Sequence, residues 1–328
     1  MKKLFFFLAF VAMSMLSMAQ VNQLVWANGR LLYGTPVESM DSLTYDEMQD
    51  IDTLHLLLPR TLVKVIHDTV YVHDTVYVDM PCPDAPSTPS QGIGVFSVSA
   101  TKQVTFSKGN LQYHPANDVW QFAANQTDYI GADNSNISDT YDGWLDLFGW
   151  GTGNCPTRAS EDYTDYPTFV DWGTNKIGND APNTWRTLTY DEWNYLLYNR
   201  TNANDLCGVA QVNGVNGLIF LPDNWTCPAG INFKSGFHSS YGPEYYAAYQ
   251  TFTADQWSQL EKSGAVFLPA AGNSDGTSVY DVQVYGYYWS ATEYNSYGAG
   301  CLDIYSDEAG MGHGHRSIGL SVRLVQDL

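Results

Sequence analysis

The residues best suited to recognition lie near the C-terminus of the chain, between Glu293 and His315. This segment is rich in tyrosine, glycine, serine, asparagine and aspartate. Tyrosine offers a large contact area at a low cost in conformational entropy, and the small polar residues provide adaptable hydrogen bonding. We therefore expect a ligand-binding surface here, formed by Glu293, Tyr294, Asn295, Tyr297, Asp303, Tyr305, Asp307 and His313. The alternative is that these residues only form the turns of a surface sheet.

Two histidines in the same segment raise the question of a metal. In an extended chain His313 and His315 direct their imidazoles to one side, which would supply half of a metal site. The sequence identifies no third ligand, so a polar loop is favoured and no metal is expected at this place. Cys301 with these histidines would resemble a Cys–His nucleophile, but nothing in the sequence fixes their geometry.

Two further patterns suggest chemistry and are better explained by structure. Gly272–Gly276 fits G-x-S-x-G, but a nucleophile elbow needs a following helix, and TSVYDVQVYGYYW is typical of strands. The acidic run from Asp133 to Asp146 lacks the pattern of an EF-hand loop. It forms either a looser calcium site or a set of solvated loop carboxylates, and the second is favoured. Calcium is thus the one cofactor left open.

Charge excludes one class of partner. The 328-residue chain has 15 basic and 35 acidic residues, a formal net charge of −20. Such a surface repels phosphate backbones and anionic lipids, so no nucleic acid is expected as a partner. Apolar residues make up 44% of the chain and charged residues 15%, a balance that supports a sizeable core.

The N-terminus predicts export. Residues 1–19 combine a basic start, an apolar centre and a small-x-small cleavage site, as in a secretory signal peptide. No cysteine follows that site, so a lipoprotein anchor is not supported, and no long apolar stretch predicts a membrane span. We expect a periplasmic, cell-surface or extracellular protein. Its five cysteines form no C-x-x-C motif, and Cys207 and Cys227 are close enough in sequence to pair, although spacing does not establish a disulfide.

Residues 20–80 predict a β-rich N-terminal segment or stalk. Asn28-Gly29 lies between two apolar runs, which indicates a hairpin. Residues 61–79 contain HDTVYV twice in tandem, with valines alternating with polar and aromatic residues. This pattern predicts a stalk strand or a segment for self-association into oligomers. The proline-rich residues 81–94 then predict a linker.

Residues 95–328 predict an α+β domain. Thr189-Tyr-Asp-Glu192 and Thr253-Ala-Asp-Gln256 are capping boxes, each followed by an apolar helical stripe. Residues 217–225 predict a buried strand that runs into a turn, and further strands follow the second helix. Residues 115–185 show little periodicity, which indicates a long irregular region.

Two segments resemble a known family. TWRTLTYDEWNYLL (184–197) is similar to the W-R-L-P-T-x-x-E-W segment of the formylglycine-generating-enzyme-like branch of the C-type lectin fold. FLPAAGNSDG, GYYWSATEY and RSIGLSVRLV, within 267–325, resemble the Fibrobacter-type major paralogous domain, which shares that fold. The resemblance covers residues 95–328 and implies a C-type lectin-like domain with two helices, a small antiparallel sheet and long loops.

The same resemblance bears on function. The oxidase relatives use two closely spaced cysteines near the C-terminus, and Cys301 has no such neighbour here, so no enzyme is expected. The sugar-binding loop motifs of calcium-dependent lectins are also missing. In relatives diversified by retroelements, variation falls in the region that corresponds to 293–315. We therefore expect a non-enzymatic binding or adhesion protein for a protein or carbohydrate on a cell surface. The alternatives are a structural surface component that assembles through its N-terminal strands, and an oxidase of the formylglycine-generating type.

Overall fold

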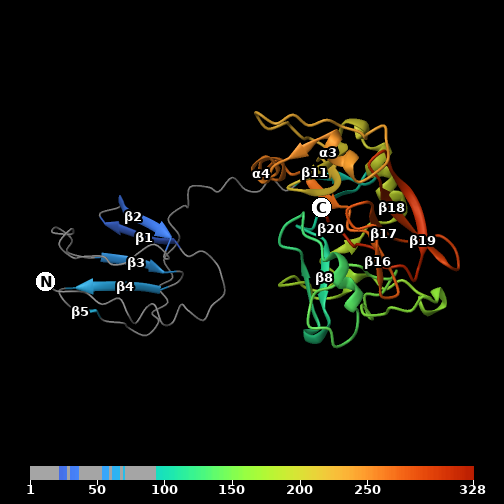
Figure 1. The fold of residues 1–328 in the computed structure, drawn as a ribbon, viewed down its shortest axis with the longest axis horizontal. Coiled ribbons are helices and arrows are strands. Elements are labelled where there is room, and N and C mark those ends of the chain that lie inside the picture. Colours follow the sequence, from blue (N-terminus) through green and yellow to red (C-terminus); the bar gives the residue numbers. More distant parts are fainter. Residues whose placement is uncertain (1–21, 28–29, 37–53, 59–60, 67–68, 71–93) are drawn as a thin grey trace. The chain divides into compact units, whose positions relative to one another are not determined.

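The computed structural model describes residues 22–27, 30–36, 54–58, 61–66, 69–70 and 94–328. The chain divides into two compact units, Met1–Asp84 and Ala85–Leu328, shown in Figure 1. The predicted signal peptide (1–19) and residues 81–93 of the predicted linker lie outside the described residues. Within the described ranges, no helix has both the length and the apolar character needed to cross a membrane.

The first unit contains a five-stranded sheet in the order β2-β1-β3-β4-β5. Its strands are β1 Asn22–Ala27, β2 Arg30–Pro36, β3 Leu54–Leu58, β4 Thr61–Ile66 and β5 Thr69–Val70. β1 and β2 are antiparallel, with Ala27 opposite Arg30, so the predicted hairpin is confirmed. β4 and β5 cover the start of the repeat segment, and residues 71–79 lie outside the described ones.

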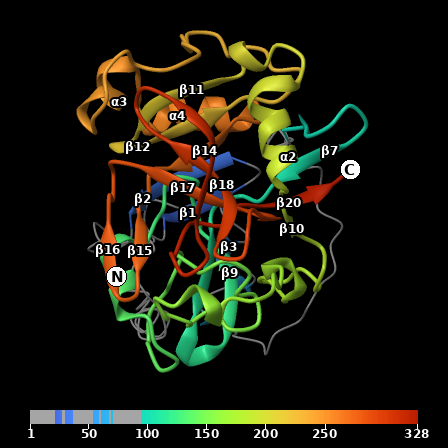
Figure 2. The same cartoon turned by 90° about the vertical axis from the view of Figure 1, so that its right-hand side faces the viewer.

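The second unit has an α+β fold of short helices and several small sheets, which confirms the predicted class (Figures 1 and 2). One sheet has the order β10-β20-β7-β6 and another β13-β11-β12-β14, and β8-β9, β15-β16 and β17-β18-β19 form the rest. The strands are β6 Phe96–Ser97, β7 Gln103–Phe106, β8 Leu111–His114, β9 Val119–Phe122, β10 Arg186–Thr187, β11 Cys207–Val212, β12 Val215–Phe220, β13 Thr251–Phe252, β14 Val266–Pro269, β15 Asn273–Asp275, β16 Ser278–Tyr280, β17 Gly286–Glu293, β18 Gly298–Ile304, β19 Ala309–His315 and β20 Leu324–Asp327.

Both predicted capping boxes are confirmed. Thr189 begins α2 Tyr190–Asn194, which continues as a π-helical turn to Asn199, and Thr253 begins α4 Ala254–Lys262. In each box the threonine hydroxyl accepts a backbone N–H three residues on, and that residue's side chain accepts the threonine N–H. These bonds satisfy donors that a helix start otherwise leaves unpaired. α3, Glu244–Tyr249, lies between them in the sequence.

The serine of the G-x-S-x-G pattern lies on β15 of the β15–β16 hairpin. Gly272 and Gly276 have φ of 76° and 56°, the left-handed region that favours glycine. The pattern therefore serves a turn, as expected.

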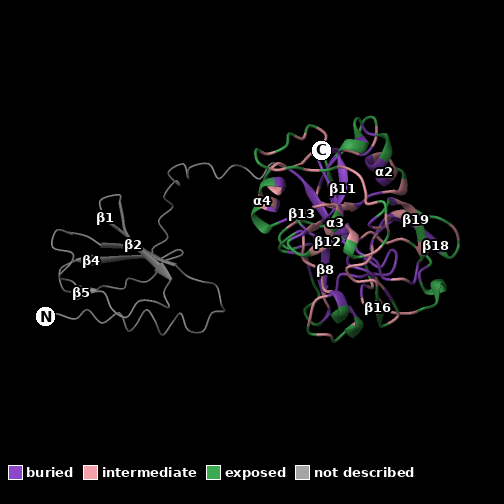
Figure 3. Cartoon of the chain, turned by 45° about the horizontal axis from the view of Figure 1, so that its top comes forward, coloured by how far each residue is buried: buried purple, intermediate pink, exposed green. Residues whose placement is uncertain are grey.

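The irregular residues 115–185 pack against the sheets through large aromatic side chains. Trp120, Phe148, Trp150 and Trp172 share a buried cluster with Trp289 and Leu320. Figure 3 shows how buried and exposed segments are distributed over the second unit. The buried carboxylate of Asp146 accepts bonds from the Ile130 N–H and the Asn134 amide, both at 2.8 Å. Asp146 thus anchors a loop, which is a structural role for one member of the acidic run.

Candidate functional site

The predicted binding segment forms most of the sheet β17-β18-β19, with β19 outermost (Figure 1). Residues 298–304 and 309–315 are regular antiparallel strands, where the sequence suggested a surface stretch and a polar loop at 313–315. Because side chains alternate between the two faces, Ala299 and Cys301 lie buried on one face, while His313 and His315 lie on the other face and are exposed. In β19 this alternation is hard to recognise from the sequence, because glycine occupies every second position.

The eight predicted site residues fall into two groups at opposite ends of the sheet. Glu293, Tyr294, Asn295 and Tyr297 lie around the β17–β18 turn, and His313 lies beside them on β19. Asp303, Tyr305 and Asp307 lie around the β18–β19 turn. β18 spans the distance between the two turns, about 20 Å at the usual rise per residue of a strand. One compact ligand therefore contacts one group or the other.

At the β17–β18 turn, rings from three segments form what we call the aromatic cluster: Tyr163, Tyr294, Tyr297, His313 and His315. Tyr294 stacks on His313, with ring centroids 4.1 Å apart and planes 16° from parallel. Tyr297 contacts His315 at 5.6 Å, and Tyr163 lies 6.2 Å from Tyr297 and 6.3 Å from His315. Tyr294, Tyr297 and Tyr163 remain 57%, 43% and 39% exposed. The cluster thus presents ordered rings to the solvent.

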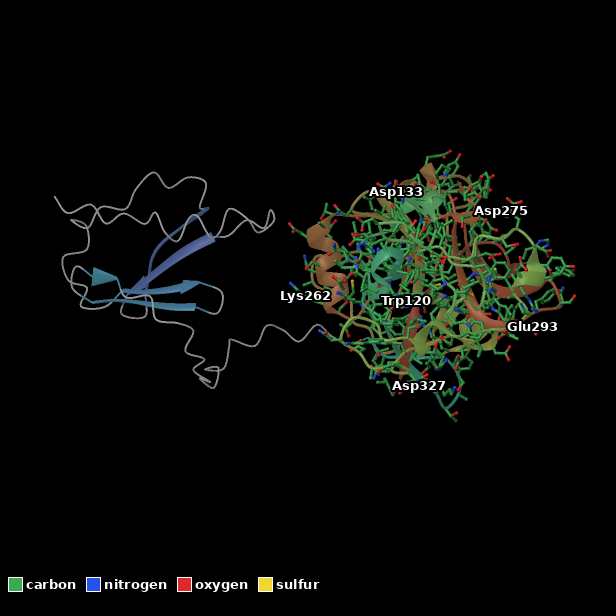
Figure 4. All side chains as sticks on the ribbon, turned by 90° about the horizontal axis from the view of Figure 1, so that it is seen from below. Trp120, Asp133, Lys262, Asp275, Glu293 and Asp327 are labelled. Carbon is green, nitrogen blue, oxygen red and sulfur yellow. The ribbon has the colours of Figure 1, made fainter. Side chains whose placement is uncertain are left out.

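Arg316 holds the turn beneath these rings. Its nearly buried guanidinium pairs with Glu293 and donates to the Asn295 carbonyl, both at 2.5 Å, and lies 4.6 Å from the centroid of the Trp150 ring. The Asn295 side-chain oxygen accepts the N–H groups of Tyr297 and Gly298, at 3.0 and 2.8 Å. Glu293 reaches the surface of the domain in Figure 4. The turn is therefore fixed before any ligand arrives, which lowers the entropy lost on binding.

The other end of the sheet, at the β18–β19 turn, combines tyrosine rings with the carboxylate of Asp303. The ring of Tyr305 lies 5.0, 6.2 and 6.2 Å from those of Tyr285, Tyr241 and Tyr287. The Asp303 carboxylate accepts the Cys301 thiol at 3.0 Å, and burial raises the pKa of Asp303. A Cβ on Gly312 would lie 2.0 Å from an Asp303 oxygen, so any larger residue at this position on β19 would displace the Asp303 carboxylate.

A hollow of about 340 Å³ lies beside this end of β19, between the strand and the helical segment 190–199; we call it the slot. The residues that line it are Tyr190, Asn194, Tyr198, Asp303, Tyr305, Glu308, Ala309, Gly310 and Met311. Tyr198 donates its hydroxyl to the Ala309 carbonyl at 2.8 Å. The slot therefore combines tyrosine rings, two carboxylates and the backbone of β19.

Cys301 and the histidines do not form a nucleophilic pair. Cys301 is opposite Gly312, and His313 is opposite Gly300, so the thiol and the imidazole point to opposite faces of the sheet. Burial raises the pKa of Cys301 well above its ordinary value, which suppresses the reactive thiolate. Cys207 and Cys227 are free thiols, so the disulfide considered for them does not form.

Metal sites were considered for two segments. His313 and His315 do lie on one face of β19, as an extended chain requires. Within residues 94–328 and the described strands of the first unit, no group of three His, Cys, Asp or Glu side chains is placed to hold a metal ion.

A larger groove of about 770 Å³ lies elsewhere, between β7, β9 and the end of α4. Its lining includes the rings of Phe106, Phe122 and Trp185 and the carboxylates of Asp180 and Glu261. It contains none of the eight predicted residues.

Several residues of these sites were not predicted. Tyr163 joins the aromatic cluster from the irregular region, Tyr190 and Tyr198 line the slot from the first helix, and Arg316 fixes the turn. The capping box predicts a helix here, and tyrosines outside its apolar stripe were a usable signal for Tyr190 and Tyr198. Nothing local in the sequence links Tyr163 to Tyr297, because their contact depends on the path of the irregular region.

Comparison with known proteins adds one family. Residues 249–325, from the end of α3 into β20, match a family described as a domain of unknown function, DUF8237. The match includes all of the sheet β17-β18-β19. No curated protein and no solved structure matches the chain.

Proposed function

We propose that this chain is an exported, non-enzymatic binding or adhesion protein that recognises a protein or glycan surface through the aromatic cluster. The observation that carries the proposal is the exposure of Tyr294 and Tyr297 on a turn already fixed by Arg316, with the exposed ring of Tyr163 beside them. Exposed aromatic rings on a preorganised support are typical of recognition surfaces, because they bury much area and lose little entropy.

The state of Cys301 supports a role without covalent chemistry. Its thiol is 2% exposed and bonded to Asp303, and its pKa is raised, so it lacks the accessibility and ionisation of a nucleophilic cysteine. The formylglycine-generating type of oxidase is therefore the weaker hypothesis.

We also propose that residues 95–328 form a C-type lectin-like domain. In support, the motif residues around α2 carry structural roles: Arg186 pairs with Glu192 at 2.7 Å, and Trp193 is completely buried. The motif thus builds the scaffold and leaves recognition to the aromatic cluster. Assembly through residues 61–79 remains a prediction, since 67–68 and 71–79 lie outside the described residues.

Binding of the full chain to an array of neutral glycans and exported or host-surface proteins tests the proposal. Binding is measured under two conditions, with calcium and with a chelator. We expect at least one specific ligand, and equal binding in both conditions because the aromatic cluster is held by ring contacts and by the hydrogen bonds of Arg316. The proposed function would be contradicted if no glycan or protein on the array binds the chain through the tyrosines of the aromatic cluster.

A further inference from the structure

β19 is an open sheet edge. Among the described residues it pairs only with β18, and both ends of this pairing are fixed by hydrogen bonds. The N–H of Tyr305 donates to the Glu308 carbonyl at 2.8 Å, and the N–H of Arg316 donates to the Tyr297 carbonyl at 3.1 Å. Hydrogen-bonded and non-hydrogen-bonded pairs alternate along an antiparallel ladder. Ala309, Met311, His313 and His315 therefore direct their backbone N–H and C=O groups away from β18.

Only the ends of this edge have partners within the part of the chain that the structure describes. The Ala309 carbonyl accepts the Tyr198 hydroxyl at 2.8 Å, and the His315 carbonyl accepts the Ile318 N–H at 3.0 Å. The outward N–H and C=O groups of Met311 and His313 have no partner in residues 94–328. Such groups are a template for a further strand.

Beyond the contact of Tyr198 with Ala309, the sequence of the edge also lacks the usual protection against strand addition. Edge strands are commonly blocked by lysine, by proline or by a bulge. The sequence of β19, AGMGHGH, contains neither residue, and its pairing with β18 shows no register shift. Gly310, Gly312 and Gly314 leave one face of β19 without side chains. The slot provides free volume beside Ala309–Met311, where an added strand would begin.

The charged residues that line the slot indicate which kind of strand would pair with β19. Asp303 and Glu308 line the slot, and no lysine or arginine is among the residues that line it. Arg316 lies at the other end of the sheet, where it is paired with Glu293. A second copy of the chain would itself carry a net charge of −20, which disfavours its approach to this acidic slot. The surroundings therefore favour a strand that carries lysine or arginine.

From these features we infer that β19 binds an extended basic peptide segment of a partner protein by strand addition. The peptide pairs with the backbone of Met311 and His313 and places its cations near Asp303 and Glu308. This inference rests on the proposed binding function and gives it a partner class. The backbone groups supply affinity, and the carboxylates supply the preference for basic sequences.

Synthetic peptides test the inference with the full chain. The first probe alternates lysine with valine and threonine, the second replaces each lysine by glutamate, and the third is the first peptide with N-methyl groups on alternate residues along one edge. We expect the basic peptide to bind, with an affinity that falls as salt is raised. We expect the acidic peptide and the N-methylated peptide to bind at least about tenfold more weakly, the effect of a few lost backbone hydrogen bonds.

Two variants examine the same edge from the protein side. His313→Pro removes the imidazole and the outward N–H, and His313→Ala removes only the imidazole. A proline is compatible with this position because the N–H does not bond to β18. We expect His313→Pro to bind the basic peptide at least about tenfold more weakly than His313→Ala, with circular dichroism confirming that both fold. If His313→Pro does not fold, the N-methylated peptide decides the question on the unaltered protein.

Four results would overturn the inference. The first is no binding of the basic peptide, the second is equal binding of the N-methylated peptide, and the third is equal affinity of the two His313 variants. The fourth is a dimer of the unaltered chain that His313→Pro abolishes, which would make β19 of a second copy the occupant. Retained binding to a protein or glycan of the array, lost when Tyr294 and Tyr297 are replaced, would leave the proposed function intact in each case.

Discussion

Tyr294 stacks on His313 across the end of β18, so a ring from the β17–β18 turn rests on a ring of the edge strand β19. The contact connects the two surfaces that we assign to recognition. It fixes Tyr294 in one orientation although that side chain is 57% exposed. A stacked aromatic pair of this kind contributes about 0.5–1.5 kcal/mol beyond its buried area.

The guanidinium of Arg316 should be the main determinant of the order of the β17–β18 turn. Arg316→Ala removes its bonds to Asn295 and Tyr166 and its contact with Trp150. We expect unfolding to become easier by about 2–4 kcal/mol, because several buried hydrogen bonds and much packing are lost together. Urea unfolding measures this change. Lys108→Ala, a change of an exposed base elsewhere, is the control, and an equal effect of both variants would contradict the assigned role.

Asp146 should make stability depend on pH. Burial raises its folded-state pKa to about 6, from an ordinary value of 3.8. The folded protein therefore binds the proton more tightly than the unfolded chain, and this contribution is complete below the unfolded pKa and is lost as pH rises through about 6. We expect the free energy of unfolding to fall by about 3 kcal/mol across that window through this group.

The substitution Asp146→Asn tests whether Asp146 causes this pH dependence. The asparagine side chain of this variant does not bind a proton in this range. Between about pH 4 and pH 7, its free energy of unfolding should therefore lack the pH-dependent contribution of Asp146. Urea unfolding of both proteins at several pH values gives the difference. Parallel pH curves for the two proteins would show that Asp146 is not the group responsible.

The cysteines should differ sharply in reactivity. Cys227 is exposed, whereas Cys301 is buried with a raised pKa. Alkylation of the folded protein with iodoacetamide, followed by peptide mass spectrometry, should label Cys227 and leave Cys301 unmodified until denaturant is added. Rapid labelling of Cys301 in the folded protein would reopen the oxidase hypothesis.

Capping threonines should contribute to stability independently of the binding surfaces. Thr253→Ala removes the hydroxyl that accepts the Gln256 N–H at the start of α4. The expected loss is about 1 kcal/mol in the free energy of unfolding. Thr253→Ser keeps the acceptor and serves as the matched control. A loss of the same size in Thr253→Ser would show that the hydroxyl bond is not the cause.

The sequence predicted elements whose signals are local. Both capping boxes, the strand after Gly217 and the turn glycines around Ser274 form as expected, because each depends on residues a few positions apart.

Distances and contacts between residues far apart in the sequence could not be predicted in the same way. Tyr294 and Tyr305 looked like members of one surface, yet β18 separates them by about 20 Å. The glycine-rich strand β19 has no apolar alternation that would reveal a strand. The contact of Tyr163 with Tyr297 joins segments more than a hundred residues apart, and no local pattern encodes it.

The most direct measurement of the central claim is binding of the full chain and its Tyr294→Ser/Tyr297→Ser variant to the ligand found on the array. Tyr280→Ser, which alters a 52% exposed tyrosine on β16 outside the aromatic cluster, is the matched control. We expect the double variant to bind at least about thirtyfold more weakly, as for the loss of aromatic hot spots, and to remain folded with a loss of stability of about 0.5–1.5 kcal/mol from the lost stacking on His313. Equal affinity of the double variant and the unaltered chain would contradict recognition through the aromatic cluster.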